Sequence, residues 1–226
     1  MIEAHTYDGV CGRLARAFEE RYRLKDVNIT GLLFARPESA LAKAEVIPNI
    51  EYWHHRSDAF TDFFCAGYGA FGGPGVPSDS RRLDDVRHVE WWYSATAFNN
   101  FLHEVERRTR WTYKGGTDII IVNARHDSKT HAAWLDFSSA IAINLEQAKK
   151  DEAMRDVPEL AEAIFWFAKN INESKDDPVW AYSDQRGVRV LRRSLKDMLI
   201  SFLPESLRPD AKAAFHFVTT DISRDQ

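Results

Sequence analysis

Cysteine is scarce in this chain, which contains only Cys11 and Cys65 among its 226 residues. Neither residue belongs to a Cys-x-x-Cys pair, and two thiols cannot form a zinc cage by themselves. We therefore expect both thiols to be reduced and packed inside the protein, as is usual in a reducing compartment such as the cytoplasm.

Long hydrophobic runs are also missing. The longest apolar run near a predicted strand extends only from Ile119 to Val122, whereas a membrane-spanning helix needs roughly 20 apolar residues. Residues 1–8 contain no basic segment followed by an apolar one, so we expect no signal peptide. These absences predict a cytoplasmic protein that has no membrane partner.

The chain lacks an excess of positive charge, because its formal net charge is -4. A mildly acidic protein needs a local basic patch to hold a polyanion, so nucleic acid is not an expected partner. Hydrophobic residues make up 44% of the chain, and seven Trp and fourteen Phe are among them. Because large rings bury much area each, the composition predicts a globular protein with a substantial core.

Five segments have the composition of β-strands, and Ile119-Ile-Ile-Val122 carries the clearest signal. The predicted strands are residues 29–35, 60–66, 117–124, 131–137 and 214–220. A helical segment separates the first two, so we expect them to be parallel and joined by a right-handed crossover. A short polar turn separates the third and fourth, so we expect those two to be antiparallel.

Amphipathic helices are predicted before, between and after these strands. They cover residues 8–24, 38–47 and 94–108, with further apolar stripes from Val157 to Ile171 and from Leu191 to Phe202. Pro48 should interrupt the second helix, because proline has no N–H to donate to the preceding turn.

The expected architecture is α/β, with a central mixed sheet, an N-terminal helix and a helical C-terminal extension. Its β-α-β-α-β-β-α order resembles that of a thioredoxin-like domain, and a flavodoxin-like or other doubly wound sheet is the alternative. We expect a single domain over residues 1–226, with a core at about 26–150 and an extension at about 151–226.

Polar residues and glycines directly follow the two strands that should be parallel. Ligands bind beyond the carboxyl ends of parallel strands, and a helix that begins near Pro37 would offer free N–H groups there. We therefore predict an anion-binding site that consists of Arg36, Glu38, Ser39, Gly67, Tyr68 and Gly69. The alternative is a surface ion pair between Arg36 and Glu38. No cysteine stands in this segment, so redox exchange is excluded there.

Gly67-Tyr-Gly-Ala-Phe-Gly72 matches the G-x-G-x-x-G pattern of dinucleotide-binding loops. Pro74 and Pro77 follow, however, where a dinucleotide site would begin its helix. A flexible or closely packed loop is the simpler interpretation.

Histidines and acidic residues suggest a divalent metal site. His103 and Glu106 are spaced to share one face of a helix, and Asp118 stands at the start of a strand. These three residues are the predicted ligands, and solvated or hydrogen-bonded histidines are the alternative. Glu104 or Glu106 with Asp118 also partly matches a restriction-endonuclease-like core, but Asp136-Phe-Ser138 stands where that core has a lysine.

Every catalytic motif in the sequence is thus incomplete. We expect a non-catalytic interaction or regulatory component of a bacterial multi-protein system, without a cofactor, that binds a protein partner or forms a homo-oligomer. The alternative function is a metal-dependent hydrolase acting on nucleic acid or phosphoesters, in which a divalent metal would activate water.

Overall fold

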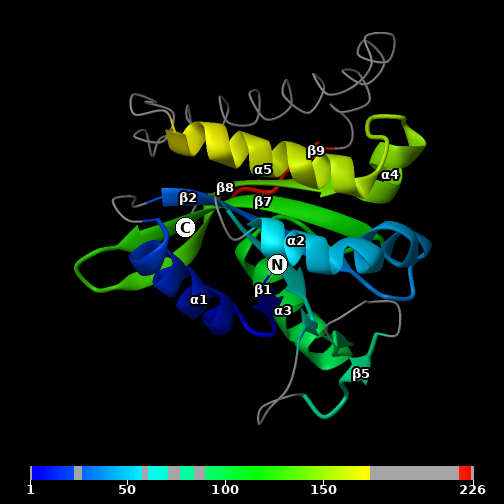
Figure 1. The fold of residues 1–226 in the computed structure, drawn as a ribbon, viewed down its shortest axis with the longest axis horizontal. Coiled ribbons are helices and arrows are strands. Elements are labelled where there is room, and N and C mark those ends of the chain that lie inside the picture. Colours follow the sequence, from blue (N-terminus) through cyan, green and yellow to red (C-terminus); the bar gives the residue numbers. More distant parts are fainter. Residues whose placement is uncertain are drawn as a thin grey trace.

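A six-stranded mixed sheet forms the centre of the protein in a computed structural model that describes residues 2–22, 27–57, 61–70, 77–83, 90–173 and 219–224 (Figure 1). Its strand order is β1-β3-β2-β7-β8-β9. The strands are β1 (Ile2–Ala4), β2 (Val27–Ala35), β3 (Asp62–Ala66), β7 (Thr117–Asp127), β8 (Ala132–Asn144) and β9 (Thr219–Asp221). The predicted parallel pairing of β2 with β3 and antiparallel pairing of β7 with β8 are confirmed.

A second, three-stranded sheet adjoins the carboxyl end of β3. It has the order β4-β6-β5, from β4 (Tyr68–Gly69), β5 (Arg81–Arg82) and β6 (Trp92–Tyr93). We call it the small sheet. A loop was predicted where β4 lies, and β1, β5 and β6 were not predicted from the sequence.

Helices cover both faces of the central sheet. They are α1 (Tyr7–Glu20), α2 (Ile50–Ser57), α3 (Ala95–Arg108), α4 (Leu145–Lys150) and α5 (Val157–Glu173). Figure 1 shows α5 on one face and α1 and α3 on the other. The described ranges contain no helix that is long and apolar enough to cross a membrane. The stripe from Leu191 to Phe202 and most of the strand predicted at 214–220 lie outside the described residues.

Successive side chains of a strand point to opposite faces of the central sheet, so each face receives its own set of core side chains. Phe63 of β3 points to the α5 face, where its ring centroid lies 5.6 Å from that of Phe165. Phe34 of β2 points to the opposite face and stacks on Phe101 of α3 at 5.7 Å. All four rings are fully buried or nearly so. The sheet therefore has an aromatic core on each side, as the composition predicted.

The single helix predicted over residues 38–47 is wrong in detail. A π-helical segment, η1 (Ala42–Val46), leads into a 3-10 turn, η2 (Ile47–Asn49), before α2 begins. Pro48 in η2 cannot donate a backbone hydrogen bond, which breaks the regular ladder. The side-chain amide of Asn49 instead donates to the carbonyl oxygen of Glu45 at 2.9 Å.

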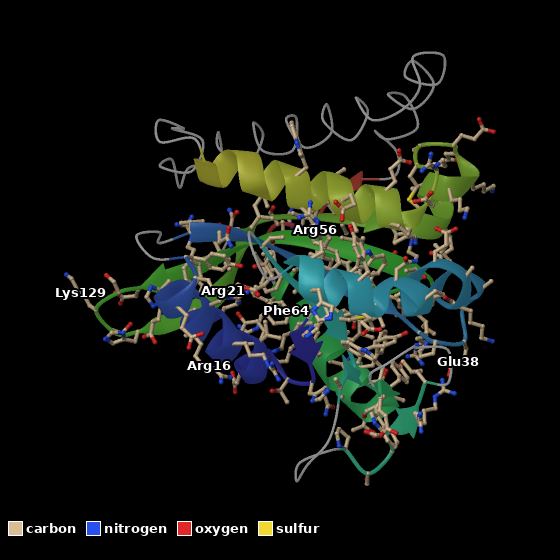
Figure 2. The ribbon with its side chains drawn as sticks, viewed as in Figure 1. Arg16, Arg21, Glu38, Arg56, Phe64 and Lys129 are labelled. Atoms are coloured by element: carbon tan, nitrogen blue, oxygen red, sulfur yellow. The ribbon has the colours of Figure 1, made fainter. Side chains whose placement is uncertain are left out.

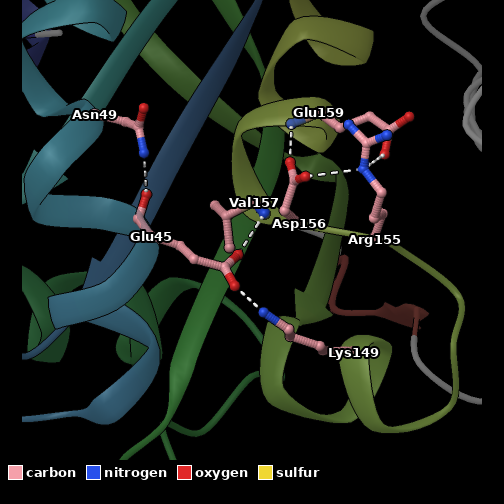
Figure 3. A network of polar contacts seen from close by, with 7 residues as sticks. All are labelled: Glu45, Asn49, Lys149, Arg155, Asp156, Val157 and Glu159. Carbon is pink, nitrogen blue, oxygen red and sulfur yellow. Dashed lines mark hydrogen bonds and ion pairs between the residues drawn. The ribbon is translucent and has the colours of Figure 1, made fainter.

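Glu45 also connects this irregular segment to the helices that follow β8 (Figure 3). Its carboxylate accepts a 2.8 Å hydrogen bond from the backbone N–H of Val157 and pairs with Lys149. The adjacent Asp156 accepts from the N–H of Glu159 at 2.8 Å, which caps the first turn of α5. These contacts anchor α4 and α5 to the part of the chain that precedes β3.

The end of α1 is anchored to β3 by a buried carboxylate. Asp62 is fully buried, and it accepts a 2.8 Å hydrogen bond from Arg21 and a 3.2 Å bond from the hydroxyl of Tyr22. The substitution Arg21→Met should lower the free energy of unfolding by about 2 kcal/mol, because it removes the charge partner and leaves Tyr22 as a donor. Chemical denaturation followed by circular dichroism would measure this loss. Arg16→Met, at an exposed position of the same helix, is the control, and an equal effect of the two variants would contradict the anchoring role.

Candidate functional site

The chain leaves β3 through Gly67, whose φ of +76° favours glycine. The N–H of Gly67 donates to the carbonyl oxygen of Ala4 at 2.9 Å, and its carbonyl accepts from the N–H of Ser94 at 2.9 Å. The next residue, Tyr68, is fully buried and donates its hydroxyl to the carbonyl oxygen of Ala35 at 2.9 Å. These bonds hold the small sheet against the carboxyl ends of β2 and β3.

Arg36 follows the last residue of β2 and is held by α3. Its guanidinium donates to the side-chain oxygen of Asn99 at 3.0 Å, and its central carbon lies 4.9 Å from the ring centroid of Phe98. Stacking on a ring fixes the plane of a guanidinium while its N–H edge remains available for further bonds. Arg36 is therefore a positioned cation at the edge of the sheet.

Glu38 pairs with Arg81 of β5 and not with Arg36 in the described part of the chain. Both side chains of this pair are more than half exposed, at 61% for Glu38 and 53% for Arg81. The guanidinium carbon of Arg81 also lies 5.6 Å from the ring centroid of Tyr93. The ion pair expected as an alternative thus exists with a different arginine, supplied by the small sheet.

Tyr93 of β6 packs against Arg81 and lies beside Phe98, the ring on which Arg36 stacks. It is 3% exposed, and its ring centroid is 5.1 Å from that of Tyr68 and 6.0 Å from that of Phe98. Burial raises the pKa of Tyr93, the positive charge of Arg36 lowers it, and the negative charge of Glu38 raises it further. The hydroxyl consequently stays protonated, and it has no hydrogen-bond partner among the described residues.

Other buried donors in the small sheet and in the residues beside it are unpaired as well. Within the described ranges, the hydroxyl of Ser80 and the indole N–H groups of Trp91 and Trp92 have no partner. Ser80 directly precedes β5, and the two tryptophans are the two residues before Tyr93. An indole nitrogen only donates, and a buried unpaired donor costs about 1–3 kcal/mol. The small sheet and the residues beside it therefore contain several unused donors.

The structure brings the six predicted ligand residues to one edge of the fold, but it gives most of them structural roles. Ser39 accepts from the N–H of Ala42 at 3.0 Å and lies 3.3 Å from the hydroxyl of Thr117. Gly69 pairs with Trp92 in the small sheet. Arg36 and Glu38 remain as candidates for contact with a ligand. Sequence reasoning missed Arg81, Tyr93 and Asn99, because only the fold brings them to Arg36.

The three predicted metal ligands are engaged in separate contacts. Nδ1 of His103 lies 3.5 Å from Oε2 of Glu106 on α3, and the other oxygen of Glu106 accepts from the N–H of Tyr113 at 2.9 Å. Asp118 accepts from Trp111 and Asn144. Across the described ranges, no three His, Cys, Asp or Glu side chains are grouped so that they could hold one metal ion.

Asp118 and its neighbours also do not reproduce a nuclease core in the described part of the protein. Glu104 pairs with Arg107 and Arg108, while Asp136 pairs with Arg125. Burial raises the pKa of Asp118 to about 6, against the hydrogen bonds from Asn144 and Trp111 that lower it. The carboxyl is 5% exposed, so water and substrate have little access to it.

Both cysteines are free thiols, with Cys65 buried and Cys11 partly buried. Burial raises the pKa of Cys65 well above its ordinary value, and burial also raises that of Cys11. Protonated thiols are poor nucleophiles. Packing is therefore the role that the geometry supports for Cys11 and Cys65.

Comparison of the chain with protein-family models, with curated proteins and with solved structures found no match.

Proposed function

We propose that this chain is a non-catalytic, regulatory binding protein that holds an anionic group at the edge of the small sheet. The site consists of Arg36, Glu38, Arg81, Tyr93 and Asn99, and we call it the arginine–tyrosine site. One observation carries the proposal, namely that the buried hydroxyl of Tyr93 has no partner in the described residues. Two arginines act on this tyrosine, because Arg81 lies over its ring and the positive charge of Arg36 lowers its pKa.

The chemistry of these groups favours an anion. Guanidinium groups form charge-assisted hydrogen bonds to carboxylate and phosphate oxygens, which are stronger than bonds between neutral partners. Arg36 is held in place by Phe98 and Asn99, so little side-chain freedom would be lost on binding. The Tyr93 hydroxyl is protonated, buried and without a partner in the described residues, so it would add a neutral donor once the side chains that cover it move aside for the ligand.

The proposed scaffold is thioredoxin-like. Its support is the side-by-side order β3-β2-β7-β8, in which β7 runs opposite to the other three strands. In such a parallel unit, ligands bind beyond the carboxyl ends of the strands. Arg36 follows the carboxyl end of β2, and Gly67 follows that of β3. The arginine–tyrosine site therefore lies where this kind of sheet offers a binding edge.

A regulatory role fits a bound anion better than turnover does. Among the described residues, the thiols are protonated and the acidic side chains near the site are committed to ion pairs or buried hydrogen bonds. A protein partner or a homo-oligomer, the bacterial setting and a cytoplasmic location remain predictions from the sequence. No described cluster favours the metal-dependent hydrolase over this proposal.

The substitution Arg36→Ala tests the proposal directly. We expect the wild-type chain to bind inorganic phosphate or acetate. Arg36→Ala should weaken that binding at least about tenfold, because it removes one charge-assisted hydrogen bond that contributes about 1.4 kcal/mol or more. Isothermal titration calorimetry and the rise in melting temperature with ligand would both report it.

Arg16→Ala is the matched control, because Arg16 is an exposed arginine on α1. Figure 2 shows Arg16 and Glu38 on opposite sides of the molecule. Equal affinities of the two variants, or no binding of either anion by the wild-type chain, would overturn the proposal.

A further inference from the structure

The ion pair between Glu38 and Arg81 differs from the contacts of Arg36. It joins two side chains that are each more than half exposed, and it connects the turn after β2 to the small sheet. Exposed pairs of this kind contribute little to stability because water competes well for both charges. The fold does not depend on this pair, and its carboxylate is the part of the arginine–tyrosine site that is easiest to displace.

Glu38 pairs with one arginine of the site and acts on its tyrosine. It binds Arg81, and its negative charge acts on the hydroxyl of Tyr93 together with the positive charge of Arg36. A carboxylate already occupies one of the two arginines, as an external anion would. Glu38 therefore competes with any ligand that uses Arg81.

The charge balance of the site depends on which partner Arg81 has. With Glu38 in place, the two arginines and the glutamate sum to one positive charge, which suits a monoanion such as a carboxylate. If Glu38 moves into the surrounding water, the two arginines present two positive charges. A phosphate monoester carries between one and a half and two negative charges near neutral pH and has three free acceptor oxygens.

The donors in the site also match a phosphate group better than a carboxylate. Arg36, Arg81 and the hydroxyl of Tyr93 are three donor side chains from separate positions in the chain. The hydroxyl of Tyr93 has no partner among the described residues. A planar carboxylate has two oxygens, whereas a tetrahedral phosphate directs oxygens toward donors on several sides.

We infer that the arginine–tyrosine site selects a dianionic phosphate group, and that Glu38 is a built-in competitor which leaves Arg81 when that group binds. This inference rests on the proposed function and adds the ligand class and a regulatory contact to it. The released glutamate would be solvated by water, which makes its displacement cheap. A monoanionic carboxylate would not displace it, because it would only replace one carboxylate by another.

Glu38→Gln tests the inference, since it removes the competing charge and keeps the size of the side chain. At about pH 8, where inorganic phosphate is mainly a dianion, we expect Glu38→Gln to bind phosphate about tenfold more tightly than the wild type. Its affinity for acetate should rise less than about threefold. Isothermal titration calorimetry with each anion gives the two ratios, and thermal unfolding of each variant confirms that it is folded.

Arg81→Ala and the double variant Glu38→Gln/Arg81→Ala complete a double-mutant cycle. Arg81→Ala should weaken phosphate binding about tenfold, and in that background Glu38→Gln should no longer increase the affinity, because Glu38 would have no arginine to occupy. A gain that persists without Arg81 would mean that Glu38 acts only through its general negative charge, and it would overturn the competitor role.

The remaining outcomes separate this inference from the proposed function. Phosphate binding that depends on Arg36 but is unchanged in Glu38→Gln would overturn the inference and leave the proposed function standing. Equal gains for acetate and phosphate would overturn the selection of a dianion. An absence of binding by the wild type and by Glu38→Gln alike would overturn both.

Discussion

Replacing Gly67 with alanine should lower the free energy of unfolding by about 3 kcal/mol or more. A φ of +76° costs an L-residue about 1–2 kcal/mol. A Cβ at this position would also lie 2.7 Å from both the Cβ of Phe98 and the carbonyl oxygen of Ser94. Crowding of a packed region typically costs about 1–3 kcal/mol more. Denaturation in urea, followed by circular dichroism, would measure the total.

Two other glycines separate the contributions to this effect. Gly115 has a φ of +91°, and nothing lies within 4 Å of a Cβ placed there, so Gly115→Ala should cost only about 1 kcal/mol of backbone strain. Gly12 lies within α1, and a Cβ there also meets nothing within 4 Å. Gly12→Ala should stabilise the protein by up to about 1 kcal/mol. A loss in Gly67→Ala no larger than that in Gly115→Ala would show that Gly67 does not pack closely against the start of α3.

This series also decides what the glycine pattern after β3 is for. The match to G-x-G-x-x-G suggested a phosphate-binding turn, whereas Gly67 lies against the start of α3 and bonds to Ala4 and Ser94. A glycine is needed at position 67 because the backbone there closely approaches the start of α3. The same sequence pattern therefore has a packing role at this position.

Long, periodic elements were predictable because their patterns repeat several times. α3 carries five buried residues on one face, and β7 contains the uninterrupted apolar run Ile119–Val122, so each was predicted within a few residues of its observed ends. The strands of the small sheet have two residues each, which is too short for any alternation. β1, with three residues, has the same limitation.

The candidate site illustrates a second limit of sequence reasoning. Arg36 was predicted because it directly follows a strand, and local order is sufficient for that inference. Its neighbours Tyr93 and Asn99 are more than 50 residues away in the chain, and Arg81 pairs with Glu38 across 43 residues. Residues 91–93 are three consecutive aromatic residues in the sequence. Whether their polar atoms have partners depends on what the fold places around them.

The carboxyl of Asp118 should make the protein less stable as the pH rises from about 4 to about 6. Burial and the negative charge of Glu146 raise its pKa, while the bonds from Asn144 and Trp111 and the charge of Lys114 lower it, and the net shift is from 3.8 to about 6. In this window the folded protein binds more protons at Asp118 than the unfolded chain does. The raised pKa therefore contributes about 3 kcal/mol to the free energy of unfolding below pH 4, and this contribution is lost by about pH 6.

Asp118→Asn removes this titration, so the difference in unfolding free energy between wild type and variant should change by about 3 kcal/mol between pH 4 and pH 7. Groups that do not interact with Asp118 titrate equally in both proteins and cancel in the difference. One of them is Asp136, whose pKa is lowered despite burial by hydrogen bonds from Ser138 and Arg125 and therefore has the opposite sign. Asparagine keeps only one acceptor for the two donors Trp111 and Asn144, so the variant should also lose a constant amount at every pH. Because that loss does not vary with pH, a difference that stays flat from pH 4 to pH 7 would mean that Asp118 ionises as freely in the folded protein as in the unfolded chain.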